Sequence, residues 1–202
     1  MDSKEHWENV YANKQPQEVS WFQQYPKTSM EFVELFKISK NSAVIDIGGG
    51  DSHLVDALIE KGFTNITVLD ISKNAIEKAK VRLGEKAKLV KWVVSDVLHF
   101  KPEENYDFWH DRAAFHFLAN EAQADEYVKI ATKAISKDRF LVLGTFSENG
   151  PKKCSGLDIK QYSEHSLSGK FEKDFKRVIC KTEDHVTPFE TTQNFLFCSF
   201  KK

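Results

Sequence analysis

The sequence predicts an α/β fold in which a mostly parallel, seven-stranded sheet lies between layers of helices and ends in an antiparallel hairpin. Three observations predict this fold. From residue 43 onward, short apolar segments alternate with segments of helical periodicity, a pattern typical of βαβ units. A run of three glycines follows the first apolar segment. The last segment, residues 194–200, is apolar on both faces, which indicates an interior strand rather than an edge strand.

The apolar segments and the capping residues place the elements in chain order. We expect strands at residues 43–47, 66–69, 89–94, 106–110, 140–145, 177–181 and 194–200. Gly62 stands where the first helix after the glycine run ends, and Ser72 stands where the next helix begins. Asn120 and Gln123 have the spacing of a capping box, which predicts a helix through about Ile135. The arrangement is a Rossmann-like three-layer sandwich.

Two regions differ in character. Residues 1–40 contain several aromatic side chains and turn signals at Pro16 and Pro26, and we expect them to form a helical extension or lid. Residues 41–202 carry the alternating pattern and form the main domain. With 202 residues in all, the chain has the length of a single domain with a sizeable core.

Charge and cysteine content limit the partners and the compartment. The formal net charge is −1, which favours neither a nucleic-acid surface nor a membrane surface built on bulk charge. No apolar run approaches the roughly 20 residues of a membrane span, and the first residues lack the apolar core of a secretory signal. The sequence has three cysteines, an odd number, and they are widely spaced: Cys154, Cys180 and Cys198. This predicts buried, reduced thiols and a cytoplasmic protein.

The glycine run and a carboxylate after the second strand predict a site for an adenine nucleoside. Gly48, Gly49 and Gly50 let the backbone turn sharply and let a ligand approach closely. Asp70 follows Gly50 by 20 residues, at the end of the second strand. A carboxylate there accepts hydrogen bonds from ribose hydroxyls. Both NAD and S-adenosylmethionine (SAM) fit this arrangement.

The charges beside the loop favour SAM. Asp46 and Asp51 flank the glycines, and no Lys or Arg lies between Asn41 and Glu60. These carboxylates would repel a pyrophosphate, whereas the methionyl end of SAM carries an ammonium and a sulfonium. The loop also reads Gly48-x-Gly50-x-Ser52 and lacks the third glycine of the dinucleotide pattern. An NAD-binding oxidoreductase is therefore the alternative.

Asp96 and Val97 follow the third strand and extend the predicted site. The Asp96 carboxylate can accept a hydrogen bond from an adenine amino group, and the Val97 N–H can donate to a ring nitrogen. A simple cap or turn role for Asp96 is the competing interpretation.

Taken together, residues 44–50, 68–72, 95–97 and 106–111 resemble the class I SAM-dependent methyltransferases. The resemblance implies a seven-stranded sheet whose last strand is antiparallel and inserted. It also implies that SAM is the cofactor and S-adenosylhomocysteine (SAH) the product. The cofactor-binding residues that we expect are Trp21, Asp46, Gly48, Gly49, Gly50, Asp70, Ile71, Asp96, Val97 and His110.

A second resemblance concerns the N-terminus. Residues 6–11 and 19–25 are similar to the entry segment of the branch that contains elongation-factor and citrate synthase lysine methyltransferases. In that branch the segment folds over the cofactor. Residues 110–117 occupy the position after the fourth strand that both this branch and the small-molecule methyltransferases use beside the methyl group, so the substrate class stays open.

We expect aromatic side chains to shape the acceptor site, because ring faces stabilise a cation and exclude water. The substrate-binding candidates are Trp21, Phe22, Tyr25, His116 and Phe146. The candidates for a general base are His110, Asp111 and His116. Each also has a plain structural interpretation as a core or hydrogen-bonded residue. The spacing of these three is not that of a metal site, and we expect no metal.

The sequence therefore predicts a SAM-dependent methyltransferase that acts on an N or S nucleophile of a protein lysine or a small molecule. A non-catalytic SAM-binding adaptor is a further alternative. The oligomeric state cannot be read from the sequence.

Overall fold

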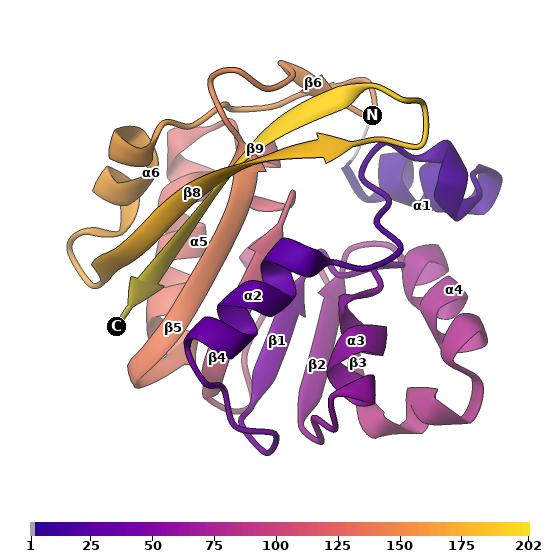
Figure 1. Ribbon diagram of the computed structural model, residues 1–202, viewed down its shortest axis with the longest axis horizontal. Helices are drawn as coiled ribbons and strands as arrows, with labels where there is room; N and C mark the ends of the chain where they lie inside the picture. Colours follow the sequence, from indigo (N-terminus) through magenta and orange to yellow (C-terminus); the bar gives the residue numbers. More distant parts are fainter. Residues whose placement is uncertain (1–2) are drawn as a thin grey trace.

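The computed structural model describes residues 3–202 and contains a central sheet with the strand order β3-β2-β1-β4-β5-β9-β8 (Figure 1). The neighbours from β3 to β5 pair in parallel, and β9 runs antiparallel between β5 and β8. This order confirms the predicted fold, including the inserted last strand. The strands are β1 (Val44–Ile47), β2 (Ile66–Asp70), β3 (Val90–Val94), β4 (Tyr106–Arg112), β5 (Ile135–Phe146), β8 (Lys176–Val186) and β9 (Thr192–Lys201).

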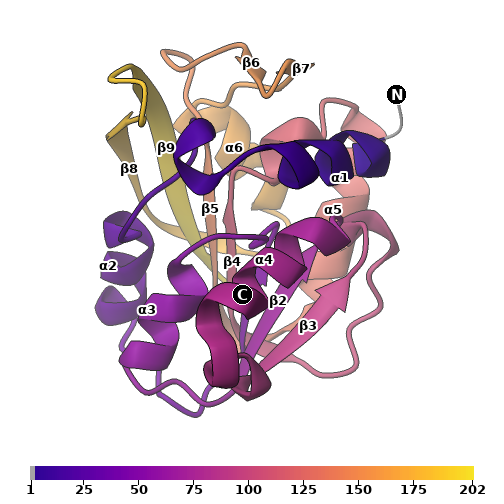
Figure 2. The ribbon, with the colours of Figure 1, turned by 90° about the vertical axis from the view of Figure 1, so that its right-hand side faces the viewer.

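Helices cover both faces of the sheet (Figure 2). Buried side chains of α5 and α6 pack on one face, and those of α2 and α3 pack on the other. A small hairpin, β6 (Lys153–Cys154) and β7 (Leu157–Asp158), lies outside the main sheet. The helices are α1 (Ser3–Asn13), α2 (Lys27–Leu35), α3 (Leu54–Glu60), α4 (Lys73–Leu83), α5 (Glu121–Ala134) and α6 (Glu164–Phe171), with short 3₁₀ turns η1 (Pro16–Glu18), η2 (Gly84–Leu89), η3 (Val97–His99) and η4 (Phe115–Phe117).

The central strands read as continuous apolar runs because both of their faces are covered. Every residue of β1 and β2 is buried, as in other parallel sheets that lie between helices. On β5, alternation sends Leu141 and Leu143 into the core under α5, and Val142 and Phe146 into the core under α2 and α3. The sheet therefore holds the carboxyl ends of β1 to β4 in fixed positions.

Most of the predicted helix signals are confirmed. Gly62 follows α3 with φ of +85°, and the Ser72 hydroxyl accepts a hydrogen bond from the Ala75 N–H at the start of α4. The capping box predicted for α5 is wrong in detail. The Asn120 side chain caps the helix by accepting from the Ala122 N–H rather than from the third helical residue.

The prediction that all cysteines are free is wrong. Cys180 and Cys198 form a disulfide across the β8–β9 pair, where the register places them directly opposite each other. Their separation of 18 residues gave no signal in the sequence, because only the hairpin register brings them together. Cys154 alone is a free, buried thiol.

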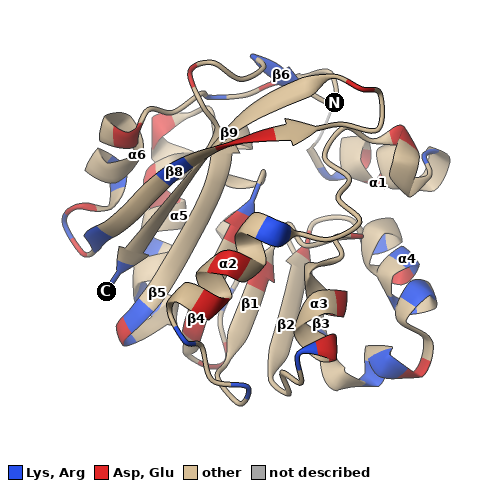
Figure 3. Ribbon diagram, viewed as in Figure 1, with Lys and Arg blue, Asp and Glu red and all other residues tan. Residues whose placement is uncertain are grey.

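The outer parts of the sheet extend beyond the predicted strands. β5 begins at Ile135, five residues before the predicted strand. The prediction missed this first part because it is exposed and polar, with Lys137 and Asp138, and therefore lacks an apolar strand pattern. β8 has mostly exposed or half-exposed side chains, as the sheet edge requires. Lys and Arg are interspersed with Asp and Glu along the ribbon (Figure 3). Among residues 3–202, no helix has the length and apolar character to cross a membrane.

The predicted boundary at residues 40/41 stays a prediction, and residues 1–2 of the extension lie outside the described residues. Within the extension, Met30, Phe32 and Val33 of α2 are buried in the sheet core. Residues 3–26 lie instead across the carboxyl ends of the central strands (Figure 2). We refer to residues 3–26 as the N-terminal cover.

Candidate active site

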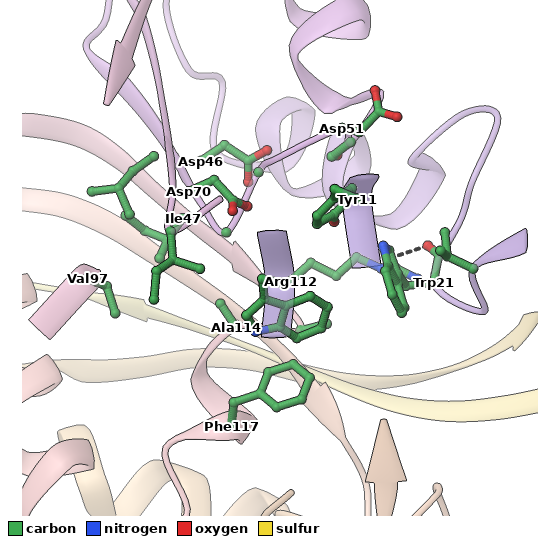
Figure 4. Close-up of a pocket in the computed structure, with 18 of the residues that line it drawn as sticks. Tyr11, Trp21, Asp46, Ile47, Asp51, Asp70, Val97, Arg112, Ala114 and Phe117 are labelled. Carbon is green, nitrogen blue, oxygen red and sulfur yellow. Dashed lines mark hydrogen bonds between the residues drawn. The ribbon is translucent and has the colours of Figure 1, made fainter. Parts of the chain in front are cut away.

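A cavity of about 260 Å³ lies at the carboxyl ends of β1 to β4, beneath the N-terminal cover (Figure 4). This is the edge at which α/β sheets bind ligands, because strand ends and helix starts meet there. Nine of the ten residues predicted to bind the cofactor line this cavity, and Gly50 does not. These nine are Trp21, Asp46, Gly48, Gly49, Asp70, Ile71, Asp96, Val97 and His110.

Neighbouring atoms leave no space for side chains at the glycines that follow β1. Gly48 has φ of +63°, and a Cβ on it would lie 2.8 Å from the Cβ of Ala114. A Cβ on Gly49 would lie 2.6 Å from the Oδ2 of Asp46. Real Cβ atoms do not approach other atoms this closely, so side chains at these positions would displace the loop. The glycines thus let the turn fit between the end of β1 and the segment after β4.

Asp46 at the end of β1 belongs to a buried hydrogen-bonded chain. Its Oδ1 lies 2.7 Å from the Nδ1 of His110, and the Nε2 of His110 lies 2.8 Å from the hydroxyl of Ser29. All three side chains are buried. The chain joins α2, β1 and β4, and it fixes the orientation of the Asp46 carboxylate.

Asp70 at the end of β2 is a buried carboxylate with remaining capacity to accept hydrogen bonds. Its Oδ1 accepts from the Ser72 N–H at 2.8 Å. Burial raises the pKa of Asp70 to about 7, and the negative charges of Asp46 and Glu8 act in the same direction. A Cβ on Gly50 would lie 2.7 Å from its Oδ2, so Gly50 makes room for this carboxylate from outside the cavity lining. Hydroxyl donors from a ligand would stabilise the charged form of Asp70.

Asp96 has the capping role that was the competing interpretation, and it still lines the cavity. Its Oδ1 accepts from the Leu98 N–H at 2.9 Å at the start of η3. Val97 and Leu98 lie beside it on the cavity wall. A cap of this kind leaves the second carboxylate oxygen able to accept a further hydrogen bond.

Aromatic rings close the cavity from above. Trp7 packs edge-on against Trp21 and Phe117, with ring centroids 5.6 Å and 5.1 Å apart. Tyr11 packs against both tryptophans, and burial raises the pKa of its hydroxyl, which therefore stays protonated. Phe22 also lines the cavity. The rings form an apolar roof on a site whose floor is polar.

Glu8 holds the N-terminal cover to the start of α4. Its carboxylate accepts from the Ser72 hydroxyl and from the N–H groups of Lys73 and Asn74, each at 2.9 Å. Burial opposes the charge of Glu8, but these hydrogen bonds outweigh it and lower its pKa. A carboxylate at a helix N-terminus is stabilised by unpaired N–H groups and by the helix dipole. Sequence reasoning assigned no role to Glu8, because nothing local in the sequence joins residues this far apart.

Arg112, the last residue of β4, lines the cavity and was also missed as a candidate. Its Nη1 donates to the Trp21 carbonyl oxygen at 2.9 Å, and its guanidinium lies 4.6 Å from the centroid of the Phe195 ring. Burial lowers the pKa of Arg112 to about 10, so the group remains charged at neutral pH. The available signal was the position of Arg112 as the one Lys or Arg of β4, at the last residue of the strand.

Asp111 lies outside the cavity. Alternation along β4 turns it to the opposite face from His110 and Arg112. There it accepts from the Ala114 N–H, the Phe115 N–H and the Tyr127 hydroxyl. The carboxylate therefore shapes the turn after β4 and is not placed to act as a base in the cavity.

His116, Phe146 and Tyr25 are likewise not among the residues that line the cavity. The Nδ1 of His116 accepts from the Phe146 N–H at 3.2 Å, and both side chains are fully buried. Burial, with the nearby charge of Arg112, lowers the pKa of His116 to about 3, so its imidazole is neutral. Tyr25 is half-exposed. Of the predicted substrate-binding residues, the structure brings only Trp21 and Phe22 to the cavity.

The charges beside the glycine loop differ in part from the expectation. Arg82 of α4 forms ion pairs with Asp51 and Asp56, so Asp51 is neutralised locally. The electrostatic case against a pyrophosphate therefore depends on Asp46 and Asp70, which have no cationic Lys or Arg partner among the described residues. Buried carboxylates at successive strand ends suit hydroxyl, amino and ammonium donors.

Comparisons with known proteins indicate which domain and which fold the chain resembles. A family model described as a methyltransferase domain matches residues 44–136. EEF1A lysine methyltransferase 2 of Danio rerio is 27% identical over 139 residues, a match that covers 64% of this chain and 60% of the relative. The aligned part of the chain thus spans about three fifths of the length of that relative.

Two solved structures share the whole fold. One, from work on the conversion of a disulfide bond into a thioacetal group during echinomycin biosynthesis, is 17% identical with a TM-score of 0.81, covering 98% of this chain and 92% of that chain. The other, N-methyltransferase NodS from Bradyrhizobium japonicum with S-adenosylhomocysteine, is 18% identical with a TM-score of 0.69, covering 100% and 99%. Residues 44–136 are thus similar to a methyltransferase domain, and the chain has the fold of SAM-dependent methyltransferases.

Proposed function

We propose that this chain binds SAM in the cavity and transfers its methyl group to an N or S nucleophile, leaving SAH. The observation that carries the proposal is the alignment of Asp46, Asp70 and Asp96 at the ends of three neighbouring strands, along one cavity. Asp96 and Val97 hold the adenine, Asp70 the ribose hydroxyls, and Asp46 with the glycine turn the methionyl ammonium. This order follows the strand order across the sheet.

The chain's own residues act by positioning and by excluding water. When bound, SAM supplies a methyl group on a sulfonium sulfur, and the C–S bond breaks as the lone pair of the acceptor forms the new bond. The rings of Trp7, Trp21 and Phe117 cover the cavity, and their faces stabilise nearby positive charge. Alignment of the reacting atoms accounts for a large part of such a rate enhancement.

The structure offers no free base among the predicted candidates. Both ring nitrogens of His110 are hydrogen-bonded, to Asp46 and to Ser29. Asp111 and His116 do not line the cavity. We therefore propose that the acceptor loses its proton to water before methyl transfer, and that His110 is a positioning residue for Asp46.

The acceptor is either a small molecule or a protein lysine. The Danio rerio relative is named for a protein lysine, and NodS is an N-methyltransferase. Both readings agree with an aromatic roof over a polar floor. The cytoplasmic location stays a prediction.

Calorimetric titration with SAH and with NAD tests the cofactor. We expect SAH to bind and NAD to show no saturable heat, because the strand-end carboxylates disfavour a pyrophosphate. The opposite ranking would contradict the proposal. Incubation of a lysate with the protein and methyl-labelled SAM, followed by mass spectrometry, then tests transfer. Binding of SAH without any labelled product would indicate the non-catalytic adaptor instead.

A further inference from the structure

The backbone fixes Arg112 at the margin of the cavity. Arg112 ends β4, and the next residue, Ala113, has φ of +70°, a conformation that is strained for a residue with a Cβ. The Ala113 N–H donates to the Gly144 carbonyl at 2.8 Å, which holds this turn in place. Strain of this kind persists where surrounding contacts enforce it, and here it directs the Arg112 side chain toward Trp21 (Figure 4).

One edge of the Arg112 guanidinium is buried and has no partner. Nη1 donates to the Trp21 carbonyl, whereas Nε and Nη2 are shielded from solvent and make no hydrogen bond among the described residues. Nε–H and one N–H of Nη2 point in parallel, which is the fork that binds both oxygens of a carboxylate. Leaving such donors unpaired in the interior is costly, so the arrangement calls for an acceptor group from a ligand.

The nearby carboxylates of the chain do not fill this role. Glu183 of β8 accepts from the Gln23 side chain at 3.1 Å through Oε1. Asp46 is hydrogen-bonded to His110. Within residues 3–202, no ion pair joins Arg112 to any carboxylate. The charge of Glu183 acts on Arg112, and the Oε2 of Glu183 is itself buried without a partner, but the two side chains form no ion pair. Nε and Nη2 of Arg112 therefore keep unused hydrogen-bonding capacity.

We propose that the methyl acceptor is an organic acid, whose carboxylate is held by Nε and Nη2 of Arg112 while its apolar part lies under the aromatic roof. This proposal rests on the proposed function and names the substrate class of that same site. Arg112 acts as a specificity residue: it selects an anionic acceptor and fixes the direction in which the acceptor lies.

The strand order favours the acceptor over the carboxylate of SAM itself. The proposed adenine, ribose and methionyl contacts occupy the ends of β3, β2 and β1 in that order, and β4 is next in line. Arg112 stacks on Phe195 of β9, which lies beyond β4 and β5. The guanidinium thus lies on the side of the cavity away from the proposed nucleoside contacts.

The test uses the wild-type protein saturated with SAH and two probes of equal shape, phenylacetate and its neutral amide, phenylacetamide. Calorimetry should show phenylacetate binding about tenfold or more tightly than the amide, the scale of a hydrogen bond to a charged group. In Arg112→Met this preference should disappear, while the affinity for SAH changes by less than about threefold. Arg112→Lys, which keeps the charge but not the fork, should retain only part of the preference. The matched control is Arg177→Met, which removes an exposed cation of β8 and should change neither titration.

Each contrary result has a defined meaning. Equal binding of the two probes, or binding of neither, would overturn the proposal on the wild-type protein alone, even if Arg112→Met fails to fold. Loss of SAH affinity by about tenfold or more in both folded Arg112 variants would assign the guanidinium to the SAM carboxylate and also overturn it. Failure of the wild-type protein to bind SAH would instead contradict the proposed function, and the probes can then be titrated against the protein without SAH.

Discussion

Asp70 is a buried carboxylate that can still accept hydrogen bonds from a ligand. Because burial raises its pKa, we expect ligand binding to depend on pH. Its pKa is raised to about 7, above the ordinary carboxyl value, so the protonated form is populated as the pH falls through neutrality. Ribose hydroxyls need the charged acceptor. We therefore expect the affinity for SAH to decrease below about pH 7 and to level off above it. Calorimetry across this range measures the effect.

Asp70→Asn is the control for that dependence. The amide keeps the size of the side chain and one acceptor oxygen but does not titrate. SAH should bind more weakly by about 1.5–3 kcal/mol, with little change between acidic and alkaline buffer. A steep pH dependence that persists in this variant would assign the titration to another group.

Gly48 gives a second test at the same scale. Gly48 has a φ of +63°, and a Cβ added to it would lie 2.8 Å from the Cβ of Ala114. Gly48→Ala should therefore disturb the turn and abolish measurable SAH binding, as judged by thermal shift. Gly169 on α6 has nothing within 4 Å of an added Cβ, so Gly169→Ala should retain full binding. Equal behaviour of the two variants would remove the glycine turn from the site.

The positions of single site residues could be predicted from the sequence where those residues lie at the end of a strand. Asp46, Asp70 and Asp96 follow apolar runs, and parallel strands bring such ends to one edge of the sheet. Asp111 and His116 were not predictable as structural residues, because their partners come from α5 and from the end of β5. Arg112 was hidden for the same reason, since its Trp21 partner is 91 residues away in the chain.

Among the elements, α1 depends on Glu8 for its attachment to α4. Glu8→Ala should leave three donors at the α4 N-terminus without this acceptor and lower the free energy of unfolding by about 1 kcal/mol. SAH should also dissociate faster, because the N-terminal cover is held less firmly. Stopped-flow measurement of tryptophan fluorescence gives this rate.

Glu5 of the same helix is the matched control. It is exposed, and Glu5→Ala removes a carboxylate from α1 without touching α4. We expect an unchanged dissociation rate for this variant. If Glu8→Ala also dissociates at the wild-type rate, the hydrogen bonds of Glu8 do not govern the cover.

At the scale of the whole molecule, the disulfide closes the outer hairpin of the sheet, and neither of its cysteines lines the cavity. Reduction should lower the free energy of unfolding by about 3 kcal/mol, the usual effect of freeing a loop of this size, and leave SAH affinity unchanged. Chemical denaturation with and without reductant measures the difference. A Cys180→Ala, Cys198→Ala double variant should be insensitive to reductant, and any response in it would point to Cys154.

The overall topology was predictable because one segment carried the decisive information. Residues 194–200 are apolar on both faces, and only an interior position buries both. The disulfide and the full length of β8 were not predictable, because they depend on the register of a hairpin whose outer strand is polar and exposed. The cavity roof was expected from the resemblance of residues 6–11 and 19–25 to a segment that folds over the cofactor, whereas no local pattern encodes the path of residues 3–26 over the sheet.

The paired nitrogens of His110 have a consequence for kinetics. In the proposed mechanism the acceptor loses its proton to water and none of His110, Asp111 and His116 takes it. The rate of the chemical step at saturating SAM then follows the acidity of the acceptor rather than that of the enzyme. A logarithmic plot of rate against pH would then rise with unit slope and bend at the pKa of the nucleophile, about 8.5 for a thiol and about 10.4 for a lysine-like amine. The bend in a pH–rate profile measured on any turnover signal, even with a crude extract as substrate, would therefore distinguish sulfur from nitrogen before the acceptor is isolated.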